Sequence, residues 1–149
     1  MTLPDWSDPA VGPSTVQGGR SAAEVALAIG QFGARHFPDR WFGVCFDQTM
    51  NKVWVQRTPG GDLDRQALDD VRHPGVEIEF VNVMASRKDF AALTERIMET
   101  DRFYWEAKGV DIRDARVSED GAGVVVVALG AQDEIRARYF PLVIKVRPY

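Results

Sequence analysis

One pattern occurs twice in this chain, and it constrains the fold more than any other feature. Ser21 precedes Glu24, and Ser86 precedes Asp89, by three positions, each pair at the start of a segment with helical apolar spacing. Such a pair is typical of a capping box, in which side chains satisfy the free N–H groups of a helix start. Two strand-like segments, a short charged helix and a last strand follow each pair. The sequence therefore predicts an α+β protein of two tandem αββαβ units, with mixed sheets and helices mainly on one face.

Periodicity places the elements of the first unit. Apolar residues recur at helical spacing after Ser21 and stop at Phe37, which precedes a proline and is therefore disfavoured in a helix. Alternating residues separated by a short polar turn then predict a hairpin. The expected segments are a helix from Ser21, strands at 41–47 and 52–57, a short helix at 63–71 and a strand at 76–83.

The second unit repeats this plan. The expected segments are a helix at 86–108, strands at 110–118 and 123–129, a helix at 131–139 and a strand at 142–146. When the two units are aligned so that Val53 matches Val124 and Val76 matches Leu142, the apolar patterns of both hairpins and of both last strands coincide. Val124–Val127 is apolar on both faces, which favours a central strand. We expect one continuous sheet or two tightly packed halves.

These patterns divide the chain into three parts. Residues 1–20 contain several prolines and glycines without periodicity, which indicates a flexible arm with Trp6 as its one anchor. Residues 21–84 form the first αββαβ unit and 85–149 the second. Together the two units are expected to make one compact domain.

Composition narrows the functional class and the location. The formal net charge is -4 with basic and acidic residues interleaved, so nucleic acid is not an expected partner. The longest uncharged apolar run, 121–131, is far shorter than the roughly 20 residues of a membrane-spanning helix. The first residues do not read as a secretory signal, and the lone Cys45 fits a reducing compartment. We expect a cytoplasmic protein that binds no membrane.

No residue set identifies a reaction. Cys45, with His36 or His73 as a base, is a candidate nucleophile, but a cysteine in the middle of a strand usually behaves as a small apolar residue. The two histidines lack metal-ligand spacing, and the paired acids lack calcium-loop spacing. We therefore expect no catalytic residue, no metal and no cofactor.

Aromatic residues of the first hairpin suggest a recognition surface. Strand alternation predicts that Phe42, Val44, Phe46, Val53 and Val55 pack under the helices. The opposite face then carries the candidate binding residues, which are Trp41, Trp54, Gln56, Glu77 and Glu79, together with Cys45. Aromatic anchors beside carboxylates are typical of binding hot spots. The alternative is that the arm, the second unit or a twin subunit covers this face.

The hairpin also carries a recognisable motif. It reads Trp41-Phe-Gly-Val-Cys-Phe-Asp47, then Lys52-Val-Trp-Val-Gln-Arg-Thr58, and it continues into strand 76–83, Ser86 and Leu93. Over about residues 40–98 it resembles the pro-regions of bacterial streptogrisin-type and α-lytic-type proteases. That resemblance implies a module that grips another protein through its sheet. The αββαβ order is also similar to that of BON modules, which bind lipid or partner surfaces.

The expected function is protein binding without catalysis. An inhibitor or immunity-type protein acting on one partner is its most concrete version, because the chain is small, acidic and without a catalytic set. One alternative is a small enzyme or ligand-binding domain that uses acids such as Asp47 or Glu79 in a pocket between the halves. The other alternative is a structural subunit, such as a homodimer, that self-associates through a sheet edge.

Overall fold

The computed structural model of the protein describes residues 20–149, which divide into two compact units. One unit ends at Arg87, and the other comprises Lys88–Tyr149. The predicted arm, residues 1–20, lies outside the described residues except for Arg20, and so does its anchor Trp6. The backbone N–H of Arg20 donates to the Pro74 carbonyl at 3.3 Å, which ties this residue to the first unit.

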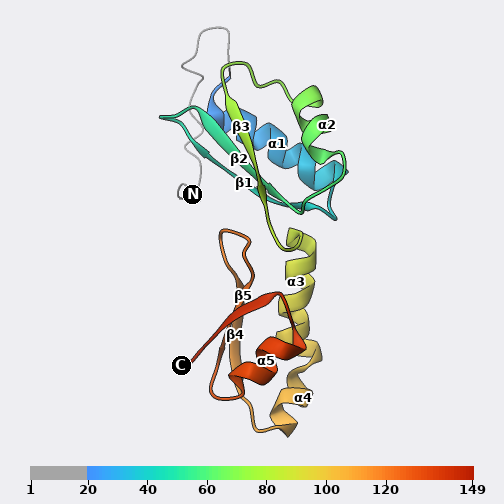
Figure 1. The fold of residues 1–149 in the computed structure, drawn as a ribbon, viewed down its shortest axis with the longest axis vertical. Coiled ribbons are helices and arrows are strands. Elements are labelled where there is room, and N and C mark those ends of the chain that lie inside the picture. The colour runs from blue at the N-terminus through green and yellow to red at the C-terminus, as the bar shows by residue number, and fades with distance from the viewer. Residues whose placement is uncertain (1–19) are drawn as a thin grey trace. The chain divides into compact units, whose positions relative to one another are not determined.

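The first unit has the predicted αββαβ order (Figure 1). Its elements are α1 (Ala22–His36), β1 (Trp41–Asp47), β2 (Lys52–Arg57), α2 (Leu63–Asp70) and β3 (Glu77–Asn82). The strand order is β1-β2-β3, with β2 antiparallel to β1 and parallel to β3. α1 packs on β1 and β2 and contacts α2, so both helices cover one face of this mixed sheet.

The first helix begins where the capping pattern predicts. The Ser21 hydroxyl oxygen accepts from the backbone N–H of Glu24 at 3.2 Å and donates to its carboxylate at 3.1 Å. Asn51, in the β1–β2 turn with a φ of 50°, completes the helix start by accepting from the Ala22 N–H at 3.0 Å. Its side-chain amide also donates to the Gly75 carbonyl at 2.6 Å. One turn residue therefore links α1, the hairpin and the entry to β3.

The core of the first unit lies between α1, α2 and the sheet. It is built from small and branched residues, as expected where a helix packs closely on strands. Its buried members are Ala22, Val25, Ala26, Ile29, Trp41, Val53, Val55, Leu63, Ala67, Val71 and Val76. An ion pair closes the edge of this core, because Arg57 of β2 holds Asp64 of α2 with two hydrogen bonds of 2.7 and 2.6 Å. The same guanidinium donates to Asn82 at the end of β3 at 2.6 Å.

The second unit repeats the order with a longer helical segment. Its elements are α3 (Arg87–Glu95), the π-helical turn η1 (Arg96–Thr100), α4 (Arg102–Ala107), β4 (Ile112–Val117), β5 (Val124–Ala128), α5 (Gln132–Arg138) and β6 (Val143–Arg147). The strand order is β4-β5-β6, antiparallel and then parallel, so β5 is central as its apolar sequence predicts. Val124, Val126 and Ala128 are buried while Val125 and Val127 are only half-buried, which shows that one face of the sheet is covered.

The long predicted helix is interrupted at Asp101. The π-helical turn ends there, and the Asp101 N–H donates to the Arg96 carbonyl five residues back at 2.8 Å. Such turns insert one residue into a helix and change the direction of the side chains that follow. Here the insertion brings the Asp101 carboxylate to the Tyr139 hydroxyl, 2.7 Å away.

Matching irregularities support the duplication. The β1–β2 register shifts between Trp41 and Gly43, and the β4–β5 register shifts between Ile112 and Asp114. Both shifts are β-bulges, each at the start of the first strand of its hairpin. Trp41 pairs with Arg57 and Ile112 with Ala128, so each residue has its counterpart 71 positions later. The two units therefore share the bulge as well as the order of elements.

Of the two expected arrangements, one continuous sheet or two halves, the first is excluded. The described strands form two separate sheets of three strands each. The apolar sequence of β5 identified it as a central strand. It does not tell how many further strands lie beyond the two that flank β5. None of the helices within residues 20–149 has the length and apolar content needed to cross a membrane.

Candidate functional site

Trp41 does not lie on the face that carries Trp54. Its indole packs on α1 against Gly33, and it belongs to the helix-side core with Val53 and Val55. The β-bulge is the physical reason, because an extra residue in one strand reverses which face the preceding side chains occupy. The predicted shared face of the two tryptophans is therefore wrong. Phe42 takes the other side, where the Arg87 guanidinium lies 4.6 Å from its ring centre.

Trp54 and Gln56 share the face opposite α1, as predicted, and both are buried. Trp54 is 4% exposed, and the Lys52 ammonium lies 5.0 Å from its ring centre. Its indole Nε1 has no hydrogen-bond partner among the described residues. This part of the sheet is not an open recognition surface, and the binding role of these residues stays a prediction.

Glu77 and Glu79 hold one lysine between them. The Lys52 ammonium lies 3.4 Å from a carboxylate oxygen of each. Burial alone would lower the pKa of Lys52, but hydrogen bonds and charge from Glu79 and Glu77 raise it above its ordinary value. The two acids, on successive residues of one strand face, therefore act as partners of a cation that also lies over Trp54.

The candidate nucleophile is buried and protonated. Burial raises the pKa of the Cys45 thiol to about 11, so almost no thiolate exists at neutral pH. The His73 ring nitrogen Nε2 lies 3.3 Å from the Leu68 carbonyl oxygen, and the His36 ring packs 5.0 Å from that of Phe32. Asp47 accepts from the backbone N–H groups of Thr49 and Met50, at 2.8 and 3.1 Å, and so fixes the hairpin turn. Within residues 20–149, no three metal-ligating side chains gather into a site.

The second unit contains a buried polar network that sequence reasoning missed. The Asp101 carboxylate accepts from the Tyr139 hydroxyl at 2.7 Å and from Arg96 at 3.1 Å. The Tyr139 oxygen in turn accepts from the Trp105 indole N–H at 2.9 Å. Burial would raise the pKa of Asp101, but Tyr139, Arg138 and Arg96 hold it below its ordinary value. Every group has a partner inside the unit, which makes the network a structural tie between α4, α5 and η1.

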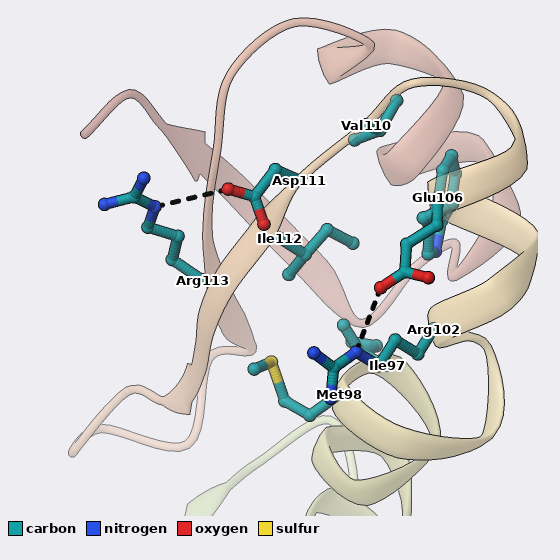
Figure 2. A pocket seen from close by; sticks show the side chains of 9 residues that line it. Ile97, Met98, Arg102, Glu106, Val110, Asp111, Ile112 and Arg113 are labelled. Carbon is teal, nitrogen blue, oxygen red and sulfur yellow. Dashed lines mark hydrogen bonds and ion pairs between the residues drawn. The ribbon is translucent and has the colours of Figure 1, made fainter.

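Surface hollows lie in the second unit, among them the following three. The first, of about 240 Å³, lies between η1, α4 and the start of β4 (Figure 2). Its charged side chains are already paired with each other, Arg102 with Glu106 at 3.1 Å and Arg113 with Asp111 at 3.4 Å. Small-molecule sites usually exceed about 300 Å³ and bring unpaired polar groups together at one point.

The second hollow is a groove between α5 and β6 with a mixed apolar and charged lining. It has a volume of about 290 Å³ and is lined by Asp133, Arg136, Ala137, Phe140, Pro141, Val143 and Ile144. Phe140 is 83% exposed and Ile144 is 40% exposed. An aromatic ring that leaves most of its surface in water at the edge of a groove is the kind of anchor that partner proteins cover. We refer to these seven residues as the α5–β6 groove.

The third hollow lies on the face of the second sheet opposite its buried core. Its volume is about 370 Å³. Its lining includes the basic residues Arg116 and Arg147 and the apolar residues Val125 and Val127. β6 therefore lines both hollows, with Val143 and Ile144 in the α5–β6 groove and Arg147 in the third hollow. The sequence predicted the strand, but exposure of Phe140 and Ile144 depends on which residues cover them in the fold. The one sequence signal for this exposure was the position of Phe140. It stands just before Pro141, between the predicted helix and the predicted last strand, and belongs to neither periodic pattern.

No known protein family and no curated protein matches this chain.

Proposed function

We propose that this protein is a binding module for another protein and that it engages its partner through the α5–β6 groove. The observation that carries this proposal is the 83% exposure of Phe140 beside the half-exposed Ile144. Burying such side chains on association is favourable by roughly 25 cal/mol per Å². An inhibitor or immunity-type protein that blocks one partner in the cytoplasm is the specific role we propose.

The groove has the composition of an interface centre with a polar rim. Its lining combines apolar residues, among them Ala137, Pro141 and Val143, with the charged Asp133 and Arg136 of α5. Protein interfaces typically combine an apolar, aromatic centre with charged residues at the edge. α5 and β6 also contact each other, so the two walls of the groove are packed together within one unit.

The proposal is tested by affinity capture from a native host lysate with tagged protein. The Phe140→Ser/Ile144→Ser variant is compared with the unaltered chain, and circular dichroism verifies that both are folded. The matched control is Leu27→Ser, which removes an exposed leucine from α1 in the first unit. We expect one stoichiometric partner that the double variant loses and the control retains. The proposal would be overturned if the folded chain captured no partner. It would also be overturned if the double variant and the control both retained the partner.

A second role, self-association through a sheet edge, is favoured by the topology of β6. β6 is the last strand in the order β4-β5-β6, and it pairs with β5 alone among the described strands. An edge strand offers unpaired backbone groups to another chain. Sedimentation across a range of protein concentrations distinguishes this role, because a self-associating subunit becomes a dimer without any partner.

A further inference from the structure

The open face of the second sheet has an apolar middle. Val125 and Val127 of the central strand β5 are half-buried there, on the side away from the buried core. Gly123, two residues before Val125, has no side chain, and Ile144 of β6 fills that place. A β-carbon on Gly123 would come 2.5 Å from Ile144 Cγ2. Ile144, Val125 and Val127 therefore form one line along the middle of the sheet, which we call the apolar row.

Basic side chains flank the apolar row on both sides. On β4, Arg116 is paired with Val125 in the strand register, and its side chain is 82% exposed. On the other side, the β5–β6 register places Lys145 and Arg147 beside the two valines, and both are exposed. The one acid among the residues that line the hollow on this face is Asp114, and it is paired with Arg116. Lys145 and Arg147 have no ion-pair partner in the part of the chain that the structure describes, so the face is locally basic on a chain of net charge -4.

The equivalent face of the first unit is covered. The two bulges set an offset of 71 positions between the units, so Trp54 corresponds to Val125. Gln56 corresponds to Val127 in the same way. Trp54 and Gln56 are buried, whereas the two valines are half-buried between exposed basic residues. A unit of this fold therefore accommodates a cover on this face, and the second unit leaves the same face open.

We infer that the open face of the second sheet binds an amphipathic helix of the partner protein whose apolar stripe has acidic residues along both edges. This inference rests on the proposed function, and it adds the chemistry of the partner. The stripe covers the apolar row, and the acidic residues meet Arg116 on one side and Lys145 and Arg147 on the other. An apolar centre inside a charged rim is the usual composition of a protein interface. Ile144 also lines the α5–β6 groove, so the two surfaces are continuous at this residue.

The arrangement of the face favours a helix over an extended strand. Apolar residues three and four positions apart form one stripe on a helix, and polar residues follow both of its edges. A strand lying on the sheet presents only one line of side chains, because alternate ones point away. β5 has five residues and is about 17 Å long, which about 12 residues of helix would cover.

The same chemistry disfavours two other occupants. A nucleic acid would meet the cations with its phosphates, but its backbone has no apolar stripe for the middle of the face, and the net charge of the chain repels it. A second copy of this face would bring like charges together, which is destabilising in neighbouring positions. Acidic residues on an apolar helix satisfy both the cations and the apolar row.

The test measures binding of fluorescent peptides to the full chain by anisotropy at low salt. The first peptide is an amphipathic helix of about 18 residues with a leucine stripe flanked by glutamates. The second has the same composition in an order without helical periodicity, and the third has lysine in place of glutamate. We expect saturable binding of the first peptide alone.

Two charge-reversal variants locate the binding surface. Arg116→Glu/Arg147→Glu reverses one cation on each side of the apolar row and should weaken binding of the first peptide by about tenfold or more, because close charge pairs contribute strongly to recognition. The matched control, Arg65→Glu/Arg102→Glu, makes the same change of charge at exposed arginines of α2 and α4. It should change the affinity by less than about threefold.

A third variant tests the apolar row itself. Val125→Thr/Val127→Thr keeps the β-branched shape that suits a strand and replaces apolar surface with hydroxyl groups. It should weaken binding of the first peptide by about threefold or more, because less apolar surface is buried in the complex. Circular dichroism verifies that each variant is folded.

Other results overturn the inference. Failure of the first peptide to bind, equal binding of the second peptide, or equal losses in the two charge-reversal variants would each exclude recognition of an acidic helix by this face. Tighter binding of a single-stranded oligonucleotide than of the first peptide, abolished by Arg116→Glu/Arg147→Glu, would make the face a nucleic-acid surface.

Capture from the host lysate separates this inference from the proposed function. If Arg116→Glu/Arg147→Glu retains the partner that Phe140→Ser/Ile144→Ser loses, the helix inference fails and the proposed function stands. If both variants retain the partner, both fail.

Discussion

The indole ring of Trp41 lies directly on Gly33, and α1 has no room there for a β-carbon. A β-carbon built on Gly33 overlaps the ring of Trp41. One turn earlier in the same helix, a β-carbon on Gly30 would make an ordinary contact of 3.5 Å with Val44. The two glycines therefore have different roles, although both stand in one helix.

This contrast predicts opposite effects of the same substitution. Gly33→Ala should destabilise the protein by about 1–3 kcal/mol, because the Trp41 ring must move from its packed position. Gly30→Ala should be neutral or stabilising by up to about 1 kcal/mol, since alanine is the better helix former. Urea unfolding followed by tryptophan fluorescence measures both. Equal effects of the two substitutions would show that the Trp41 ring is not packed on Gly33.

Truncating Trp41 tests whether this residue is core or a binding anchor. Trp41→Ala removes a large buried ring and should cost about 3–5 kcal/mol of folding free energy. Leu27→Ala, on the exposed side of α1, should change the stability by less than about 0.5 kcal/mol. Thermal unfolding by circular dichroism gives both values. A stable Trp41→Ala variant that has lost its partner would instead return Trp41 to the binding surface.

The Asp101 network predicts a loss of stability in acid. Because Tyr139, Arg138 and Arg96 lower the pKa of Asp101 despite its burial, the folded state binds its proton less readily than the unfolded state. The resulting stabilisation is complete above the ordinary pKa of about 3.9 and is lost as the pH falls through the folded pKa. Asp101→Asn should remove this contribution and flatten the stability profile below about pH 4. Asp69→Asn, at an exposed carboxylate of α2, should leave the profile unchanged.

Tyr139 is predicted to hold the network together. Tyr139→Phe removes the donor to Asp101 and the acceptor of the Trp105 indole N–H. Leaving buried polar groups without partners costs about 1–3 kcal/mol each, so the substitution should destabilise the protein by at least that amount. Tyr149→Phe loses one exposed hydrogen bond to Asp111 and serves as the control. Denaturant unfolding measures both variants, and equal stabilities would contradict a structural role of the network.

Cys45 is predicted to be unreactive in the folded protein. With a pKa of about 11, its thiolate fraction at pH 8 is about one in a thousand, and the side chain is buried as well. A chromogenic thiol reagent should therefore react at the rate of unfolding, and reaction should accelerate in denaturant. Rapid labelling of the native protein at pH 8 would contradict the burial of this strand face.

Periodicity predicted the elements of this fold well and the faces of its strands less well. Helical spacing after Ser21 and alternation in Val124–Val127 identified α1 and the central strand β5, because both patterns follow directly from burial on one or two faces. The bulge beside Trp41 has no such signal, since any residue type tolerates the insertion, and it moved the indole to the other face. The π-helical turn before Asp101 also gave no sequence signal, and the partner of the Asp101 carboxylate, Tyr139, is distant in sequence.

The candidate site was less predictable because it depends on contacts between residues that are distant in sequence. Trp54 and Gln56 were correctly placed on one strand face, but sequence spacing does not say whether a face is covered. Phe140 and Ile144 are ordinary core residue types, and only the fold shows that they stand in water beside α5. Exposure is a property of tertiary packing, so an exposed groove has to be found in the structure.

The most direct test is hydrogen–deuterium exchange of the protein with and without the host partner that it captures. We predict that the partner slows exchange in α5 and β6, residues 132–147, because they form the groove and the free edge. The hairpin of β1 and β2 should exchange equally in both samples. Slowed exchange confined to the first sheet, with α5 and β6 unchanged, would contradict the proposed binding surface.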